Sequence, residues 1–253
     1  MEFEVQLSDP FFTIHDAALA EAPEAWMFDP QALHQRGLAI GHGDDGRGRV
    51  LFFDPPMPGS SGQWVLRHYF RGGAVARILG DRYLWTGLSR SRPWREFLLT
   101  ARMRDEGLPV PRPVAARLSR AGLYYRADLV TQRVPDACSF DARLRQGSLT
   151  SRHWHGVGAC VRRFHDAGYC HADLNSRNIL IDACDRIWLL DWDRGRWRPQ
   201  GSWREENLAR LKRDLEKHVR QHDGWFFSAS DFAKLLAGYH DPSAAPTSDS
   251  NRS

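Results

Sequence analysis

Lysine is nearly absent from this chain of 253 residues. Only three of its 35 basic residues are lysines, at positions 212, 217 and 234. A cationic side chain supplied by residues 1–211 must therefore come from another residue type, usually arginine. Arginine presents a planar fork of donors, whereas lysine presents a compact point charge. The net charge is +4 and 42% of the residues are apolar, which is an ordinary globular balance.

Cysteine is scarce and long apolar runs are missing. The four cysteines form no C-x-x-C pair, so we expect reduced thiols in a cytosolic protein and no disulfide framework. The longest apolar runs, such as 187–190 and 225–227, are far too short to span a bilayer. The first ten residues are polar and acidic, which is not the pattern of a signal peptide.

Local patterns divide the chain near Val134-Pro135. Residues 1–134 carry short β-rich runs separated by Gly and Pro clusters, with one helix expected near 93–105. Residues 135–240 are mainly helical, and the apolar spacing of 148–167 indicates an amphipathic helix. Further helices are expected at 139–145, 205–222 and 230–237, the last with Ser230 as N-cap. Residues 241–253 have almost nothing to bury and are expected to be disordered.

The strongest chemical signal is the segment His171-Ala-Asp-Leu-Asn-Ser-Arg-Asn178, followed by a hydrophobic run that ends at Asp191. Phosphoryl transfer needs one carboxylate that orients the attacking hydroxyl and accepts its proton. It also needs a carboxylate and a side-chain carbonyl that hold Mg²⁺ against the triphosphate. We therefore expect Asp173 to be the catalytic base and Asn178 and Asp191 to be the magnesium ligands.

This pair of motifs, with Asp191 18 positions after Asp173, resembles the catalytic and metal loops of the protein-kinase-like superfamily. The resemblance implies an α+β fold of two lobes, with a mainly antiparallel N-lobe that has one helix and a mainly helical C-lobe. Asn175 replaces the usual lysine, Asp193 replaces the usual glycine, and no A-P-E-like segment follows. These departures favour small-molecule or lipid-sugar kinases. Asp193 either assists metal binding or is a solvated or arginine-paired carboxylate beside Arg194 and Arg196.

The nucleotide phosphates need donors in the first lobe. Residues 41–46 match G-x-G-x-x-G, and we expect Gly46 and Gly48 to be among the phosphate-binding backbone positions. Because the usual lysine is missing, Arg67 on a predicted strand is the candidate cation, with Glu96 on the following helix as its partner. The alternative is that Arg67 is a surface residue and that another cation serves.

Four segments together are similar to the lipopolysaccharide kinase family: 64–73, 108–113, 171–178 and 207–212. The family resemblance implies use of ATP and Mg²⁺. The acceptor would be the 4-hydroxyl of the 3-deoxy-D-manno-octulosonic acid (Kdo) sugar on Kdo-lipid IVA, in lipopolysaccharide core synthesis. It also implies a peripheral protein on the cytoplasmic face of the inner membrane of a Gram-negative bacterium. We expect a monomer with no nucleic-acid partner.

The segment that leads into the helix of the first lobe is rich in arginine. Six arginines of segment 71–95 surround Tyr83, Leu84 and Trp85, a composition that suits an anionic membrane surface. A solvated loop in an arginine-rich protein explains it equally well. Three other functions stay open: a kinase of an aminoglycoside- or choline-like substrate, a protein kinase, and a nucleotide-binding pseudokinase scaffold.

Overall fold

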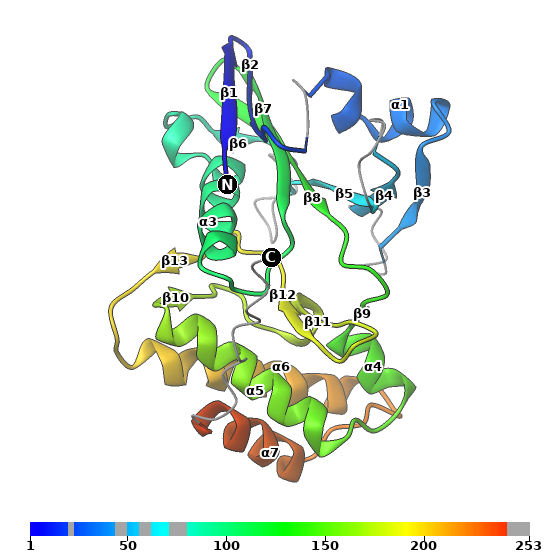
Figure 1. Ribbon diagram of the computed structural model, residues 1–253, viewed down its shortest axis with the longest axis vertical. Helices are drawn as coiled ribbons and strands as arrows, with labels where there is room; N and C mark the ends of the chain where they lie inside the picture. The colour runs from blue at the N-terminus through cyan, green and yellow to red at the C-terminus, as the bar shows by residue number, and fades with distance from the viewer. Residues whose placement is uncertain (20–22, 44–49, 56–61, 71–79, 242–253) are drawn as a thin grey trace, which may run out of the picture. The chain divides into compact units, whose positions relative to one another are not determined.

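The computed structural model describes residues 1–19, 23–43, 50–55, 62–70 and 80–241. The chain divides into two compact units, Met1–Pro135 and Asp136–Ser253 (Figure 1). The first unit is a mainly antiparallel sheet with helices and the second is mainly helical, so the expected α+β fold is confirmed. Gly46 and Gly48 lie outside the described residues, as does the expected tail beyond Asp241.

Unit 1 is built on an eight-stranded antiparallel sheet. The strands run β1-β2-β7-β8-β5-β4-β3 across the sheet, and β6 pairs with β8. Their bounds are β1 Phe3–Ser8, β2 Phe11–Asp16, β3 Ala39–His42, β4 Val50–Phe53, β5 Trp64–His68, β6 Tyr83–Leu84, β7 Pro113–Ala121 and β8 Tyr124–Gln132. The helical segments are η1 Ala25–Phe28, α1 Pro30–Gln35, η2 Leu88–Arg90 and α3 Arg92–Asp105.

The sheet of unit 1 is covered on both faces. Phe97 of α3 is fully buried against Ile14, Leu118 and their neighbours on one face. On the other face, η1 and α1 pack against a core that includes Leu33 and Trp64. Because successive side chains of a strand point to opposite faces, β5 buries Trp64 on the α1 side and directs Arg67 to the α3 side.

Unit 2 consists of helices with two small sheets. The helices are α4 Phe140–Gln146, α5 Ser151–Asp166, α6 Trp203–Gln221 and α7 Ala229–His240, with the short turn η3 Ser176–Asn178. The strands are β9 Cys138–Ser139, β10 Tyr169–Cys170, β11 Ile179–Ile181, β12 Ile187–Leu189 and β13 Arg196–Trp197. The sheets are β12-β11-β9 and β10-β13. The described helices include none that is both long and apolar enough to cross a membrane.

Helices α5 and α7 approach each other unusually closely. A Cβ atom added to Gly158 of α5 would lie 1.9 Å from the backbone oxygen of Leu235, and one added to Gly238 of α7 would lie 2.0 Å from that of His155. Real Cβ atoms do not approach backbone this closely. Only glycine therefore fits at these two positions, and the two backbones are in direct contact.

The structure adds to the expected elements and corrects one of them. The hairpin β1–β2 and helix α1 were not expected from the sequence, although Phe3, Val5 and Leu7 alternate with polar residues as in a strand. The N-cap of α7 is Ser228 and not Ser230. Ser228 is chosen because it forms a capping box with Asp231, with reciprocal bonds between side chains and backbone N–H groups.

Candidate active site

The central loop of unit 2 begins directly after α5. The helix ends at Asp166, and Gly168 turns the chain with a φ of +83°, which glycine adopts without strain. The two-residue strand β10 then leads into residues 171–178, and the hairpin β11–β12 follows. This order is the one that the motif predicted: a helix, a polar loop, and a short apolar hairpin that ends at Asp191.

His171 fixes the start of the loop from the inside. Its Nδ1 accepts the backbone N–H of Asp173 at 3.1 Å, and its Nε2 donates to the carbonyl of Leu190 at 2.7 Å. These partners require the neutral ring with the proton on Nε2. Burial lowers the pKa of His171 from its ordinary value, against the opposing effects of the Leu190 carbonyl and the nearby aspartates. The ring joins residues 171–178 to the end of β12.

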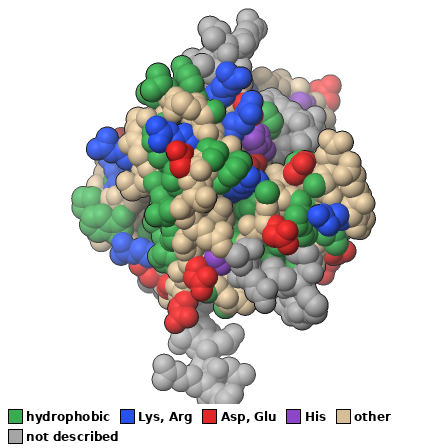
Figure 2. All heavy atoms as spheres, turned by 90° about the horizontal axis from the view of Figure 1, so that it is seen from above, with side chains coloured by type: hydrophobic (Ala, Val, Ile, Leu, Met, Phe, Trp, Pro, Cys, Tyr) green, Lys and Arg blue, Asp and Glu red, His purple; other side chains and the backbone are tan. Residues whose placement is uncertain are grey.

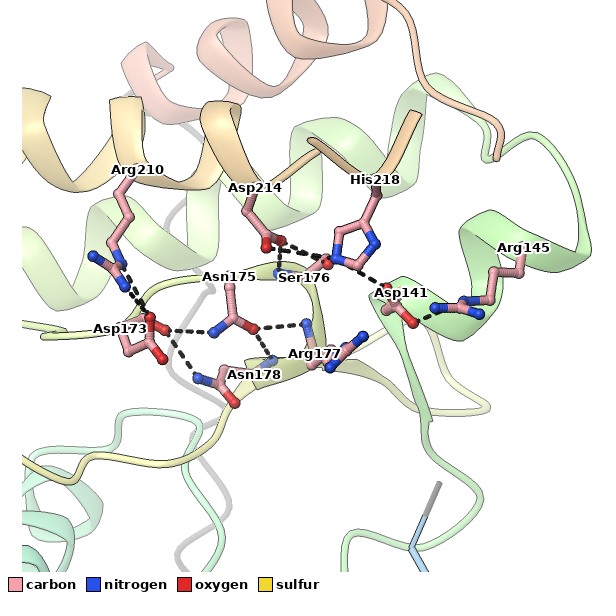
Figure 3. Close-up of polar contacts among 10 residues, drawn as sticks. All are labelled: Asp141, Arg145, Asp173, Asn175, Ser176, Arg177, Asn178, Arg210, Asp214 and His218. Atoms are coloured by element: carbon pink, nitrogen blue, oxygen red, sulfur yellow. Dashed lines mark hydrogen bonds and ion pairs between the residues drawn. The ribbon is translucent and has the colours of Figure 1, made fainter. Parts of the chain in front are cut away.

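Asn175 and Asn178 hold the same loop from the other side. Both side-chain amides donate to the carbonyl of Asp173, at 3.0 and 2.9 Å. The Oδ1 of Asn175 also accepts the backbone N–H groups of Arg177 and Asn178, at 2.9 and 3.2 Å (Figure 3). Asn175 therefore caps η3 and rigidifies the loop, a structural task that a lysine at this position has no acceptor to perform.

Asn178 and Asp191 lie at the same end of the hairpin. The N–H of Leu190 donates to the carbonyl of Asn178 at 2.8 Å, one step beyond the pairing of Ile179 with Leu189. Asp191 follows Leu190 with a φ of +56°, a conformation that non-glycine residues adopt at a cost of about 1–3 kcal/mol and that clusters at functional sites. The buried ring of Trp192 next to it packs 4.6 Å from His171 and anchors the turn.

The side chain of Asp173 is held by an arginine from a distant helix. Arg210 of α6 donates to its Oδ1 from Nε at 3.1 Å and also from Nη2 (Figure 3). The two side chains are 54% and 48% exposed for Asp173 and Arg210, so the pair faces solvent. No residue that the structure describes bonds to the second carboxylate oxygen, Oδ2. One oxygen is therefore fixed while the other remains available to a substrate hydroxyl.

Three residues of α6 contact this loop. The Nδ2 of Asn207 donates to the carbonyl of His171 at 2.7 Å, Arg210 holds Asp173, and the Oδ2 of Asp214 accepts the N–H and the hydroxyl of Ser176, each at 2.8 Å. Sequence reasoning did not assign a role to any of these three. The available signal was their spacing of three and four residues, which forms a polar stripe beside the apolar stripe of Leu208, Leu211 and Leu215.

A second polar layer supports the far end of the loop. His218 of α6 lies 3.6 Å from Asp214 and 3.7 Å from Asp141 of α4, and Arg145 holds the other oxygen of Asp141 at 3.0 Å. Burial lowers the pKa of His218, although both carboxylates oppose this effect. The layer thus joins α4 and α6 behind Ser176.

The residues of the hairpin end fit a magnesium ion. The Nδ2 of Asn178 is engaged by the Asp173 carbonyl, so its Oδ1 faces away from that contact as an oxygen ligand. Within the described ranges, no three His, Cys, Asp or Glu side chains gather into a metal cage. Mg²⁺ is typically held by one or two carboxylates together with phosphate oxygens and water, so the pair Asn178 and Asp191 is a suitable donor set beside a nucleotide.

In unit 1 the structure brings Arg67 and Glu96 together. The Nη2 of Arg67 lies 2.5 Å from the Oε1 of Glu96, whose side chain is only 4% exposed. Tyr69 donates its hydroxyl to the other carboxylate oxygen and accepts from Arg67 at 3.1 Å. A buried carboxylate needs such a partner. The guanidinium fork can bind a carboxylate on one edge and a phosphate on another, so the pair fits the role of the missing lysine.

Part of the expected basic segment has structural partners. Arg92 donates to the hydroxyl of Tyr83 at 2.8 Å and stacks on its ring, and Tyr83 itself is buried. Leu84 remains 54% exposed. The arginines at 71 and 77 lie outside the described residues.

Comparisons with known proteins identify the family of the chain. The model of the lipopolysaccharide kinase (Kdo/WaaP) family matches residues 40–239. Several curated relatives carry the name 3-deoxy-D-manno-octulosonic acid kinase. The one from Stenotrophomonas maltophilia K279a is 42% identical over 85% of this chain and 84% of its own length. The one from Vibrio cholerae is 36% identical over 89% and 93%, and the one from Xanthomonas axonopodis pv. citri is 45% identical over 85% and 84%. The chain belongs to the lipopolysaccharide kinase (Kdo/WaaP) family.

Proposed function

We propose that this chain transfers the γ-phosphoryl group of ATP to the 4-hydroxyl of Kdo on Kdo-lipid IVA, a step of lipopolysaccharide core synthesis. Its relatives are named as kinases of that sugar acid. The observation that carries the proposal is the fixed loop of unit 2. There Asp173 presents one oxygen to solvent, while Asn178 and Asp191 lie at the end of one hairpin.

Asp173 acts as the general base in this proposal. Its backbone is held at both its N–H and its carbonyl, by His171 and by the two asparagines, so the carboxylate is positioned before the acceptor arrives. The acceptor hydroxyl donates to Oδ2, which takes its proton as the oxygen attacks the γ-phosphorus. His171 has no part in the proton transfer, because both of its nitrogens are already bonded within the protein.

Each unit has its own residues suited to nucleotide binding. In unit 2, Asn178 and Asp191 would hold Mg²⁺, which would neutralise charge on the phosphate oxygens. In unit 1, Arg67 would bind a phosphate while it pairs with Glu96. Gly46 and Gly48 are proposed to supply backbone N–H groups.

A single assay separates this function from its alternatives. Purified protein with Mg²⁺ and radiolabelled ATP is offered Kdo-lipid IVA, lipid IVA without Kdo, an aminoglycoside, choline and a generic protein substrate. We expect label only on the Kdo-bearing lipid. Transfer to one of the other acceptors but not to this lipid would refute the proposal. Nucleotide binding without any transfer would favour a pseudokinase scaffold.

We also propose that the protein works on the cytoplasmic face of the inner membrane, where ATP and a lipid acceptor meet. One end of the unit 1 sheet carries exposed apolar side chains, which we call the sheet-end patch. Its apolar members, with their exposed fractions, are Leu7 (65%), Phe11 (43%), Leu84 (54%) and Leu123 (71%). Figure 2, which looks onto the upper end of Figure 1, shows hydrophobic and basic side chains side by side on this face.

The sheet-end patch also contains arginines, and a backbone contact joins two of its turns. The N–H of Arg120 donates to the carbonyl of Pro10 at 2.8 Å, which joins the β7–β8 turn to the β1–β2 turn. Arg117 lies over the ring of Phe11, and Arg120 lies over that of Trp85. Exposed apolar residues beside arginines and aromatic rings suit the interface of an anionic bilayer.

A further inference from the structure

We propose that Arg210 binds the carboxylate of the acceptor sugar, next to the catalytic base, and thereby selects an acidic acceptor. This inference rests on the proposed function, because it concerns the acceptor of the same site. It assigns a residue of α6 to acceptor recognition, and it names the chemical class of the ligand as a sugar acid with a carboxylate close to the hydroxyl that reacts.

The guanidinium of Arg210 is only half used by the protein. Its Nε and Nη2 both donate to the Oδ1 of Asp173, so one edge of the fork lies against the base (Figure 3). Among the described residues, nothing bonds to Nη1, which shares the other edge of the fork with the second hydrogen of Nη2. An arginine edge with two parallel N–H donors matches the geometry of a carboxylate.

The loop does not need Arg210 to keep its shape. Asn207 and Asp214, on the same helix, already hold the backbone at His171 and at Ser176. Both of those contacts are more buried than the contact of Arg210 with Asp173, which faces solvent with each side chain about half exposed. Exposed ion pairs contribute little to stability. The position of Arg210 is therefore better explained by a ligand that arrives from solvent.

The chemistry of the reaction creates a charge problem that Arg210 solves. The relatives act, by name, on 3-deoxy-D-manno-octulosonic acid, which carries a carboxylate. Such an acceptor must place its hydroxyl on the Oδ2 of Asp173, and its carboxylate then lies near a second negative charge. Two negative charges that lie close together repel each other strongly where water is excluded. A guanidinium that contacts the base and still has a free edge offsets that repulsion at the point where it arises.

The test compares two acceptors in wild type and two variants. Steady-state kinetics are measured for wild type, Arg210→Ala and Arg210→Lys with Kdo-lipid IVA and with its carboxyl-reduced counterpart, in which the Kdo carboxylate is an alcohol. For Arg210→Ala we expect the KM for Kdo-lipid IVA to rise about 10- to 100-fold, as for the loss of a charge-assisted hydrogen bond. The KM for ATP should not change, and Arg210→Lys should recover part of the loss.

The reduced acceptor separates recognition from positioning. If Arg210 binds the carboxylate, wild type should bind the reduced acceptor about as weakly as Arg210→Ala binds the acidic one. Arg210→Ala with the reduced acceptor should then show a KM only slightly higher than either change alone produces. Equal losses for both acceptors, or a loss in kcat alone, would show that Arg210 only positions Asp173 and would overturn the inference.

Controls separate this result from trivial ones. Arg213→Ala removes an exposed arginine of the same helix for which the structure shows no contact with Asp173, and it should leave both KM values unchanged. If Arg210→Ala does not fold, the comparison of the two acceptors in wild type and Arg210→Lys still tests whether Arg210 recognises the carboxylate. Should wild type phosphorylate neither acceptor, the proposed function itself fails. Activity of wild type that is equal on both acceptors refutes the inference alone.

Discussion

At the scale of single residues, Asp173 and Asp191 have different surroundings and so different expected losses. Asp173 presents a half-exposed carboxylate to the acceptor side, so Asp173→Asn should reduce kcat by about 10²- to 10⁴-fold and leave the Kd for Mg-ATP nearly unchanged. Asp191→Asn should weaken Mg-ATP binding itself, because it removes a proposed metal ligand. Single-turnover transfer and equilibrium nucleotide binding measure the two effects. Near-normal turnover in Asp173→Asn would show that another group is the base.

Arg67 carries a second prediction at this scale. Arg67→Ala removes the guanidinium that pairs with the buried carboxylate of Glu96, so we expect at least a tenfold weaker Kd for ATP and a lower melting temperature. The double variant Arg67→Ala/Glu96→Gln also removes the buried negative charge. It should recover stability but not nucleotide binding. If nucleotide binding recovers as well, Arg67 serves the fold and another cation binds the phosphate.

The placement of Asp173, Asn178 and Asp191 was predictable because it is local in sequence. Asp173 and Asn178 lie on one loop, and the hairpin to Asp191 is short, so spacing alone indicated that they would meet. Arg210 could not be found in this way, since its contact with Asp173 joins residues 37 positions apart. Only the folded position of α6 decides which of its many arginines faces the loop.

At the scale of elements, the contact of α5 with α7 makes a sharp prediction. Gly158→Ala places a methyl group on the backbone of α7, so the helices must separate, at a cost of about 1–3 kcal/mol or more. Gly156→Ala is the matched control on the same helix. Its new Cβ would meet only the Cγ1 of Ile187 at an ordinary 3.6 Å, and the higher helix propensity of alanine favours it by up to about 1 kcal/mol. Thermal unfolding should rank Gly156→Ala above Gly158→Ala. Equal melting temperatures would contradict the close packing.

Element bounds followed from the sequence where one pattern dominated. The apolar spacing of α5 and the helix expected over 93–105 indicated elements that the structure places at Ser151–Asp166 and Arg92–Asp105. The prediction of Ser230 as the N-cap of α7 was wrong because Ser228 and Ser230 are equally suitable N-caps by residue type. The pairing of Ser228 with Asp231, three residues later, was the signal that decides between them.

At the scale of the whole molecule, acidification should weaken folding through His165. This ring accepts from the hydroxyl of Tyr239 at Nδ1 and donates to Asn207 at Nε2, and burial lowers its pKa to about 4. Between pH 6.5 and 4, His165 binds a proton in the unfolded chain but stays neutral in the folded protein. The free energy of unfolding therefore falls as the pH falls, by up to a few kcal/mol. Urea unfolding midpoints at pH 7.5, 6.5 and 5.5 measure the loss, and His165→Gln should reduce the slope.

His68 in unit 1 has the opposite effect on the pH dependence of stability. Burial lowers its pKa, but Asp128 at 2.6 Å and Asp81 at 3.2 Å outweigh burial, and the net pKa is raised. Its contribution is complete at low pH and is lost as the pH rises through the raised pKa. A protein that becomes more stable from pH 7.5 to 5.5 would show that His68 outweighs His165.

The proposed membrane association is also tested at the scale of the whole molecule. Vesicles with anionic lipid should sediment the protein, and vesicles of phosphatidylcholine alone should not; added salt should weaken the binding. The double variant Leu84→Glu/Leu123→Glu should abolish sedimentation, because both residues are exposed members of the sheet-end patch. Val219→Glu, at an exposed apolar residue of α6, is the control. Unchanged sedimentation of the double variant would exclude the sheet-end patch as the membrane contact.

The arginine that pairs with Glu96 has a practical consequence for how this enzyme is detected. Reactive acyl-phosphate analogues of ATP label kinases by acylating a lysine amine beside the bound nucleotide, and a guanidinium is far less nucleophilic than an amine. Unit 1 contains no lysine, and the three lysines of the chain lie on α6 and α7. Because Arg67 is the residue proposed to contact the nucleotide phosphate, we expect a survey of cell extracts with such probes to pass over this protein, even when ATP is bound and turnover is normal.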